Sequence, residues 1–196
     1  MENLLDRLNA ELSEVVDAAE RSLVQITNGS RGAGAGTIWH ADGLIITNAH
    51  VVRHRHPQVT LPDGRRFPAR VLAYDAGLDV AALAIDAHDL PTIEPGDSRS
   101  LRPGDWVMAL GHPWGVLGAA TAGTVIGVGP SPEGIAGGRD LVQVSLHMRP
   151  GHSGGPLIDV RGRLTGINAM IAGPDVGFAV PVHVVRDFLR RALGRA

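Results

Sequence analysis

The sequence predicts an all-β protein built from two six-stranded antiparallel β-barrels, with one helix at each end of the chain. Three observations lead to this fold class. Short apolar runs alternate with Gly, Pro, Asn and Asp turns from residue 23 to residue 180. These runs fall into two sets of six, separated by a proline-rich stretch. Helical periodicity occurs only before the first set and after the second.

The first half of the chain is expected to hold one helix and one barrel. We expect one domain over residues 1–196, a length that can bury a substantial core. Residues 1–20 place leucine and valine at helical spacing and predict an amphipathic helix, packed on its own domain or on a neighbouring subunit. The first barrel is expected over 21–90, with strands at Leu23–Thr27, Gly36–His40, Leu44–Thr47, Gln58–Leu61, Arg66–Tyr74 and Val80–Ile85.

The second half repeats this rhythm after a connecting segment. Residues 91–104 contain three prolines and few large apolar groups, which is typical of a crossing between two lobes. Pro181 opens a short helix over 182–193. The second barrel is expected over 105–181, with strands at Asp105–Leu110, Ala119–Val128, Leu141–His147, Pro156–Val160, Leu164–Ala172 and Val176–Val180.

Composition excludes several classes of function. A net charge of −2 gives no sign of nucleic-acid or anionic-membrane binding. The absence of cysteine excludes thiolate catalysis and Cys-ligated zinc, and the absence of lysine excludes a Ser–Lys dyad. No apolar run approaches the ~20 residues of a membrane span. The N-terminus lacks a signal-peptide pattern, so the sequence as written predicts a soluble, cytoplasmic protein.

A glycine-flanked serine at 151–155 is the strongest chemical signal in the chain. Gly151, His152, Ser153, Gly154 and Gly155 follow one another, and glycine lets a substrate approach the backbone closely. The N–H groups of Gly151 and Ser153 can then point at one spot beside the serine hydroxyl, which is what acyl transfer needs. A serine hydroxyl is a poor nucleophile alone, so this reading requires a base and a group that orients the base.

His50 and Asp79 are the candidates for these two roles. His50 follows a buried strand, and Asp79 precedes the apolar run Val80–Ile85. A carboxylate at the mouth of such a run is partly buried and needs a partner, which His50 would supply. We therefore expect Ser153 to attack, His50 to take and return the proton, and Asp79 to fix the imidazole tautomer.

Taken together, these motifs resemble the trypsin-like serine proteases, and more narrowly their HtrA/Deg branch. The resemblance covers about residues 10–190. It implies a serine endopeptidase that cleaves unfolded or flexible polypeptides through an acyl-enzyme, with the oxyanion bound at Gly151, His152 and Ser153 and with no cofactor or metal. The matching segments are Gly34–Gly36, Thr47–Val52, Leu78–Leu83, Gly104–Val107, Gly111–Gly115, Pro150–Pro156, Gly166–Asn168 and Gly177–Pro181.

The sequence departs from the branch at several positions. His152 and His112 both stand where the branch usually has asparagine, and His147 lies six residues before Ser153, near the expected floor of the S1 pocket. A histidine at 147 favours a polar P1 residue if it points inward, but a side chain turned to solvent is preferred. The resemblance implies a pocket for small or medium apolar P1 residues, lined by His147, Asn168, Ala169, Met170 and Ile171.

The resemblance also carries expectations about assembly and location. HtrA proteins usually carry PDZ domains after the protease, and this sequence ends near the predicted C-terminal helix. Relatives are often homotrimers assembled through N-terminal segments, so residues 1–20 are candidates for assembly. If a leader has been removed, the resemblance implies the periplasm or cell envelope.

The sequence also bears on three other interpretations. Nine histidines suggest a metal, but His50, His54 and His56 lack a recognised ligand spacing, and we expect the last two on a solvated loop. Ser153, Asp175 and His183 follow the order of an α/β-hydrolase, but Pro156 and the hairpin after it argue against the required helix. The remaining alternative is a resting or inactive protease fold that binds extended peptides by strand addition.

Overall fold

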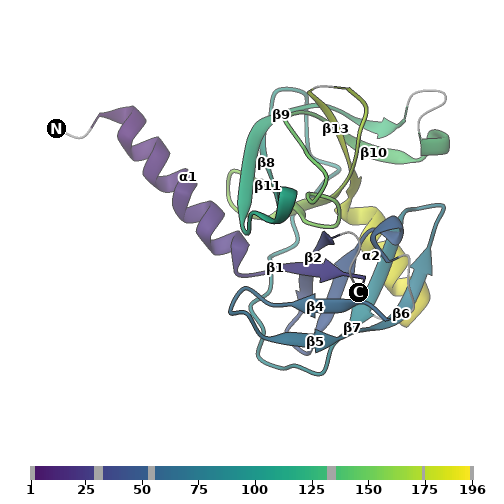
Figure 1. Cartoon of the computed structure of the whole chain (residues 1–196). Helices are drawn as coiled ribbons and strands as arrows, with labels where there is room; N and C mark the ends of the chain where they lie inside the picture. Colours follow the sequence, from purple (N-terminus) through teal and green to yellow (C-terminus); the bar gives the residue numbers. More distant parts are fainter. Residues whose placement is uncertain (1–2, 29–32, 53–55, 132–135, 174, 195–196) are drawn as a thin grey trace.

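The computed structural model describes residues 3–28, 33–52, 56–131, 136–173 and 175–194. Strands dominate these ranges, and the α-helices within them lie near the two ends of the sequence. Figure 1 shows two β-rich units, one above the other, with the N-terminal helix reaching outward from the side of the molecule. The predicted fold class is confirmed.

The first unit is a curled sheet. Within the described residues its strand order is β5-β4-β1-β2-β3-β7-β6. The predicted strand Arg66–Tyr74 is divided at Ala69, because the chain changes its pairing partner there from β4 to β7. The two pieces form opposite edges of the sheet and are joined by Ala69 alone, so the sheet must curl until its edges meet. The strands are β1 (Leu23–Thr27), β2 (Ala33–His40), β3 (Leu44–Thr47), β4 (Gln58–Thr60), β5 (Arg66–Pro68), β6 (Arg70–Asp75) and β7 (Val80–Ala84).

The second unit is a closed antiparallel barrel. Its strands follow the order β10-β13-β12-β11-β8-β9 in the part of the chain that the structure describes. The bounds are β8 (Trp106–Gly111), β9 (Ala119–Pro130), β10 (Asp140–Ser145), β11 (Pro156–Asp159), β12 (Leu164–Ile171) and β13 (Val176–Pro181). Short 3₁₀ turns η2 (Pro113–Gly115) and η3 (Ala136–Gly138) precede β9 and β10.

Apolar side chains fill each unit and also the junction between them. One cluster lies inside the curled sheet and a second lies inside the closed barrel. A third joins residues of both units, among them Ile46 of β3 and Leu110 of β8. The C-terminal helix α2 (Val182–Leu193) adds Phe188 and Leu189 to this third cluster. The two units are therefore packed together by a shared core, which fixes how residues from each face the other.

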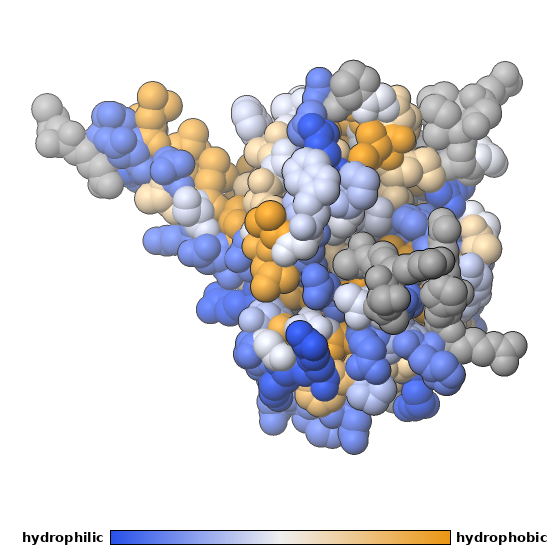
Figure 2. Space-filling view, viewed as in Figure 1, coloured by the Kyte–Doolittle hydropathy of each residue, from blue (hydrophilic) through white to orange (hydrophobic). Residues whose placement is uncertain are grey.

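The N-terminal helix α1 (Leu4–Glu20) is anchored at one end only. The side chain of Asn3 caps it by accepting the N–H groups of Leu5 and Asp6. Its last turns pack against the shared core, whereas Leu4 and Leu5 are 79% and 72% exposed. Figure 2 shows hydrophobic surface along the helix where it leaves the body. The end of the helix therefore packs on its own chain, whereas its start is exposed and can pack on a neighbouring subunit.

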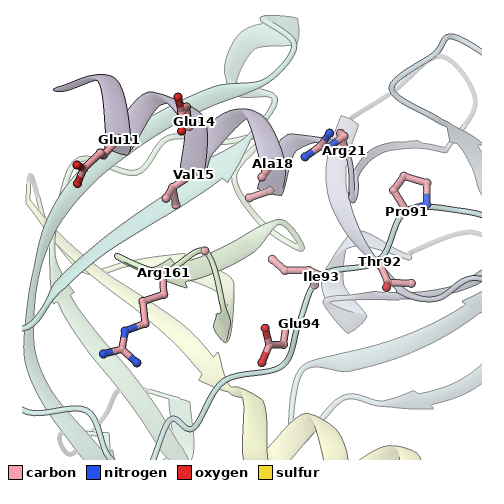
Figure 3. Close-up of a pocket in the computed structure, with 12 residues that line it drawn as sticks. Glu11, Glu14, Val15, Ala18, Arg21, Pro91, Thr92, Ile93, Glu94 and Arg161 are labelled. Carbon is pink, nitrogen blue, oxygen red and sulfur yellow. The ribbon is translucent and has the colours of Figure 1, made fainter. Parts of the chain in front are cut away.

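A hollow of about 490 Å³ lies under the packed end of α1. Figure 3 shows Glu11 and Val15 of the helix on one side, with Ile93 and Glu94 of the crossing segment and Arg161 across from them. The crossing segment itself lies beside β12, because Glu94 and Gly96 exchange backbone hydrogen bonds with Leu164. This hollow is built by the helix anchor and lies outside the candidate active site.

Candidate active site

His50 and Asp79 meet because two neighbouring strands bring them together. His50 lies in the 3₁₀ turn η1 (Ala49–Val51) that follows β3, and Asp79 directly precedes β7. Thr47 at the end of β3 pairs with Ala81 near the start of β7. Nδ1 of His50 lies 2.9 Å from Oδ2 and 3.0 Å from Oδ1 of Asp79. The carboxylate thus holds the proton on Nδ1, which leaves Nε2 as the basic nitrogen of the neutral ring.

Asp79 is held in a backbone conformation that few residues other than glycine adopt. Its φ is +57°, in the left-handed region, which costs an L-residue about 1–2 kcal/mol. Its carboxylate accepts the backbone N–H of His50 at 3.1 Å, and its carbonyl accepts the amide of Asn48 at 3.1 Å. The residue is only 7% exposed, so little water competes for the carboxylate. These bonds maintain a strained position, which is typical of functional sites.

Ser153 lies in a glycine-rich turn that leads into β11. Gly151 and Gly154 have φ values of +110° and +88°, which glycine adopts without strain. The N–H of His152 donates to the carbonyl of Arg149 at 3.0 Å and closes a β-turn with Gly151 at one corner. The chain reverses here at a point where larger residues could not follow the same path.

The serine turn offers a hydroxyl and two unpaired N–H groups. The Ser153 hydroxyl donates to the carbonyl of Ala169 in β12 at 3.1 Å. Among the described residues, neither the N–H of Gly151 nor that of Ser153 donates a hydrogen bond within the chain. Unpaired N–H groups in a tight turn are suited to bind an anion. The turn can therefore stabilise negative charge that develops beside the hydroxyl.

The serine turn of the second unit docks on β2 of the first. The N–H of Ala35 donates to the carbonyl of Ser153 at 2.8 Å. A Cβ at Gly34 would lie 2.6 Å from Cγ1 of Val51 and 3.3 Å from the Ser153 carbonyl oxygen. Gly34 therefore fits between the serine turn and the residue that follows His50. These contacts place the serine and the histidine–aspartate pair at one interface between the two units.

The sequence profile of the trypsin-like peptidase domain matches residues 34–167, a range that contains His50, Asp79 and Ser153. The chain belongs to the trypsin-like peptidase family. The expected resemblance is confirmed, and curated relatives and solved structures narrow it to proteins of HtrA type.

Three similar proteins illustrate this relation to the HtrA type. The mitochondrial serine protease HTRA2 of Drosophila willistoni is 38% identical over 168 residues, which is 83% of this chain and 39% of that protein. A probable periplasmic serine endoprotease of DegP-like type from Chlamydia pneumoniae is 37% identical over 154 residues, covering 76% and 32% of the two chains. The structure of the HtrA-type protease AlgWS227A with a tripeptide superposes with a TM-score of 0.85 at 30% identity, over 94% of this chain and 64% of that chain. This chain therefore spans about two fifths of the HTRA2 relative.

A hollow of about 180 Å³ opens beside Ser153. The predicted pocket residues Ala169, Met170 and Ile171 line it. The full lining comprises Met148, Arg149, Pro150, His152, Ser153, Ala169, Met170 and Ile171.

Asn168 and His147 are not in this lining, which corrects the expectation that both residues line the pocket but agrees with the preferred solvent-facing position of His147. Asn168 is fully buried, and its amide donates to the carbonyls of Leu110 and Pro156 at 3.1 and 3.0 Å. It holds strands together instead of meeting substrate. Nδ1 of His147 lies 2.9 Å from Oδ1 of Asp175 at an exposed position, in agreement with the preferred solvent-facing reading.

Two buried histidines, His112 and His152, lie at the serine turn. No pattern in the sequence predicted that they lie close together. Nδ1 of His112 accepts the N–H of Gly118 at 3.2 Å, and Nδ1 of His152 lies 3.1 Å from both the N–H and the carbonyl oxygen of Arg149. Burial lowers the pKa of each ring; the charge of His152 lowers that of His112 further, while the carbonyl of Val24 opposes the shift. The sequence marked these two positions only because both stand where the HtrA/Deg branch usually has asparagine.

The structure does not assemble the α/β-hydrolase arrangement. Ser98 Oγ lies 2.8 Å from Nδ1 of His183, and Asp175 is paired with His147. A strand, β11, follows Ser153 where that fold requires a helix.

Neither a metal centre nor a membrane-spanning helix is found in the described part of the chain. The described residues contain no group of three or more His, Asp or Glu side chains placed to hold a metal ion. His56 is exposed, and His54 lies outside the described residues. No helix within the described ranges has both the length and the hydropathy needed to cross a bilayer.

Proposed function

We propose that residues 1–196 act as a single protease domain of HtrA type that hydrolyses unfolded or flexible polypeptides through an acyl-enzyme. The observation that carries this proposal is the 2.9 Å contact between His50 Nδ1 and the buried Asp79 carboxylate, at the same interface as the serine turn. A serine hydroxyl needs a base oriented in this way. The similar proteins named as serine proteases support the same reaction.

The first half of the reaction uses all three side chains. The Ser153 hydroxyl leaves the Ala169 carbonyl, gives its proton to Nε2 of His50, and its oxygen bonds to the scissile carbonyl carbon. Asp79 stabilises the imidazolium that forms. The new oxyanion accepts hydrogen bonds from the N–H groups of Gly151 and Ser153. When the carbon–nitrogen bond breaks, the imidazolium donates its proton to the leaving amine.

The second half repeats these steps with water. His50 takes a proton from water while the water oxygen bonds to the ester carbon of the acyl-enzyme. Collapse of the second tetrahedral intermediate breaks the ester bond and returns the proton to the Ser153 oxygen. Because protonated imidazole cannot accept a proton, activity should fall at low pH.

The hollow beside Ser153 favours small or medium apolar side chains at P1. Met148, Ala169, Met170 and Ile171 supply an apolar wall, and no acidic side chain among the described residues lines it. A basic P1 residue would have no charge partner there, and its burial would be costly. Cleavage sites should therefore follow small or medium apolar residues and avoid Arg and Lys.

The decisive experiment compares wild type, Ser153→Ala and Ser100→Ala on casein. Ser100 is the matched control, because its hydroxyl is exposed and bonds only within its own turn. We expect cleavage by wild type and Ser100→Ala, and none by Ser153→Ala. Mass spectrometry of the products gives the P1 residues, and a fluorophosphonate reports whether Ser153 reacts covalently. Unchanged proteolysis by Ser153→Ala would overturn the proposal, whereas no cleavage and no labelling in wild type would favour a peptide-binding form.

We propose further that the free start of α1 assembles the chain into a homotrimer. Leu4, Leu5 and Leu8 are exposed on a helix that leaves the body of the molecule, and burial of such side chains would stabilise an assembly. Sedimentation velocity should show a trimer for wild type and a monomer for Leu4→Glu/Leu8→Glu. Glu11→Gln, on the same helix, is the control for altered charge. A monomeric wild type would contradict this assembly.

A further inference from the structure

Arg139 reaches across the interface between the two units to the loop that holds Asp79. It lies between η3 and β10 of the closed barrel, 60 positions after Asp79 in sequence. One guanidinium nitrogen, Nη1, donates to the carbonyl of Gly77 at 3.1 Å. The other, Nη2, lies 3.8 Å from Oδ2 of Asp79. The second unit thus contacts both the backbone and the carboxylate of the Asp79 loop.

The Asp79 carboxylate is consequently shared between two cationic or ionisable partners. His50 approaches it from η1, with Nδ1 at 2.9 Å, and Arg139 approaches it from the second unit. The side chains of Arg139 and Asp79 are 14% and 9% exposed, so water screens their attraction only weakly. The remaining acid of this loop, Asp75, is engaged locally, because its Oδ1 accepts the N–H of Leu78 at 2.9 Å.

The backbone contact of Arg139 acts on a strained segment. Asp79 keeps its left-handed φ of +57° only while its surroundings hold it there. The bond from Arg139 to the Gly77 carbonyl holds the same loop two residues earlier, from the opposite unit. Arg139 is itself fixed through its carbonyl, which accepts the N–H of Ser131 at 2.9 Å. The chain of contacts therefore runs from the second barrel to the aspartate that orients His50.

We propose that Arg139 is a positioning residue for the His50–Asp79 pair. It acts through Asp79 and does not line the hollow where substrate binds. This inference rests on the proposed function, because it matters for turnover only if His50 is the base. Loss of Arg139 should lower kcat by loosening the pair, and it should leave KM nearly unchanged. Loss of the Arg139 charge should also strengthen the attraction between the Asp79 carboxylate and the His50 imidazolium.

The test compares Arg139→Gln, Arg139→Lys and the control Arg163→Gln in the full chain. Arg163 also pairs with an aspartate, Asp159 at 2.7 Å, but within the β11–β12 hairpin. Titration with a fluorophosphonate counts reactive sites, so turnover is measured per folded active site. We expect kcat of Arg139→Gln to fall about ten- to one-hundredfold. The acid limb of its kcat/KM profile should move to higher pH, because a carboxylate without a guanidinium partner attracts imidazolium more strongly.

Arg139→Lys should restore the position of the acid limb but only part of kcat, because lysine keeps the charge without the planar two-nitrogen fork. The downfield NMR signal of the His50 Nδ1 proton reports the same hydrogen bond without turnover, and it should change in Arg139→Gln and not in Arg163→Gln. The inference would be overturned if Arg139→Gln kept the kcat, the acid limb and the NMR signal of wild type. Unchanged hydrolysis by Ser153→Ala would instead overturn the proposed function, whatever Arg139 does.

Discussion

Replacing Gly154 with alanine would disturb the contact through which the serine turn docks on the first unit. Gly154 has a φ of +88°, and a Cβ there would collide with the carbonyl oxygen of Ala35 and the hydroxyl of Thr47. The left-handed backbone costs an alanine about 1–2 kcal/mol, and overpacking adds about 1–3 kcal/mol. We therefore expect the free energy of unfolding to fall by about 2–5 kcal/mol.

Gly64 provides the matched control for this substitution. Its φ is +86°, and a Cβ there would meet nothing within 4 Å. Gly64→Ala carries the backbone strain without the collision, so it should lose only about 1–2 kcal/mol and keep wild-type turnover. Urea denaturation gives both free energies, and turnover per fluorophosphonate-titrated site should fall about a hundredfold in Gly154→Ala alone. Equal stability losses in the two variants, or full turnover in Gly154→Ala, would refute the reasoning.

Asp79→Asn should lower kcat by about 10⁴-fold with an unchanged circular dichroism spectrum, the size of effect reported for this change in a serine–histidine–aspartate triad; a loss under tenfold would contradict the role given to the carboxylate. Burial lowers the pKa of His112 and of His152 in the folded chain. Near the ordinary imidazole pKa of about 6.5, the unfolded chain therefore binds protons that the folded chain does not bind. Stability should therefore be complete above about pH 7 and decline as the pH drops below about 6.5. Urea midpoints should show this decline in wild type, and a smaller one in His112→Asn/His152→Asn; identical declines would argue against the pair. His147→Ala should leave the P1 residues mapped by mass spectrometry unchanged, because the imidazole pairs with Asp175 at the surface; an altered P1 pattern would count against that placement.

The parts of the structure that sequence predicted are those encoded by short segments. Strand periodicity and turn residues identified the second barrel strand by strand, with small differences at the ends. The first unit differed at Ala69, where a strand that looks continuous in hydrophobicity changes its pairing partner from β4 to β7. His50, Asp79 and Ser153 could be proposed as candidates for a similar reason, since each lies in a short local pattern beside a predicted strand.

The parts that sequence did not predict depend on contacts between distant segments or on local irregularity. The pairing of β12 with β13 shifts between Asn168 and Met170, so strict alternation could not indicate which side chains face the hollow. The proximity of His112 to His152 and of Arg139 to Asp79 arises only when loops from different strands meet. No periodicity in the chain encodes such contacts, although the unusual histidines marked two of the positions.

The division of the site between two units has a consequence for synthesis. The first half of the chain carries His50 and Asp79, the proposed base and its orienting group, and the proposed nucleophile Ser153 follows in the second half. A ribosome-bound chain that has emerged only as far as β7 therefore holds no nucleophile, and a misfolded second half leaves the histidine without a hydroxyl to activate. If the proposed mechanism holds, an active site forms only after both units have been synthesised and folded.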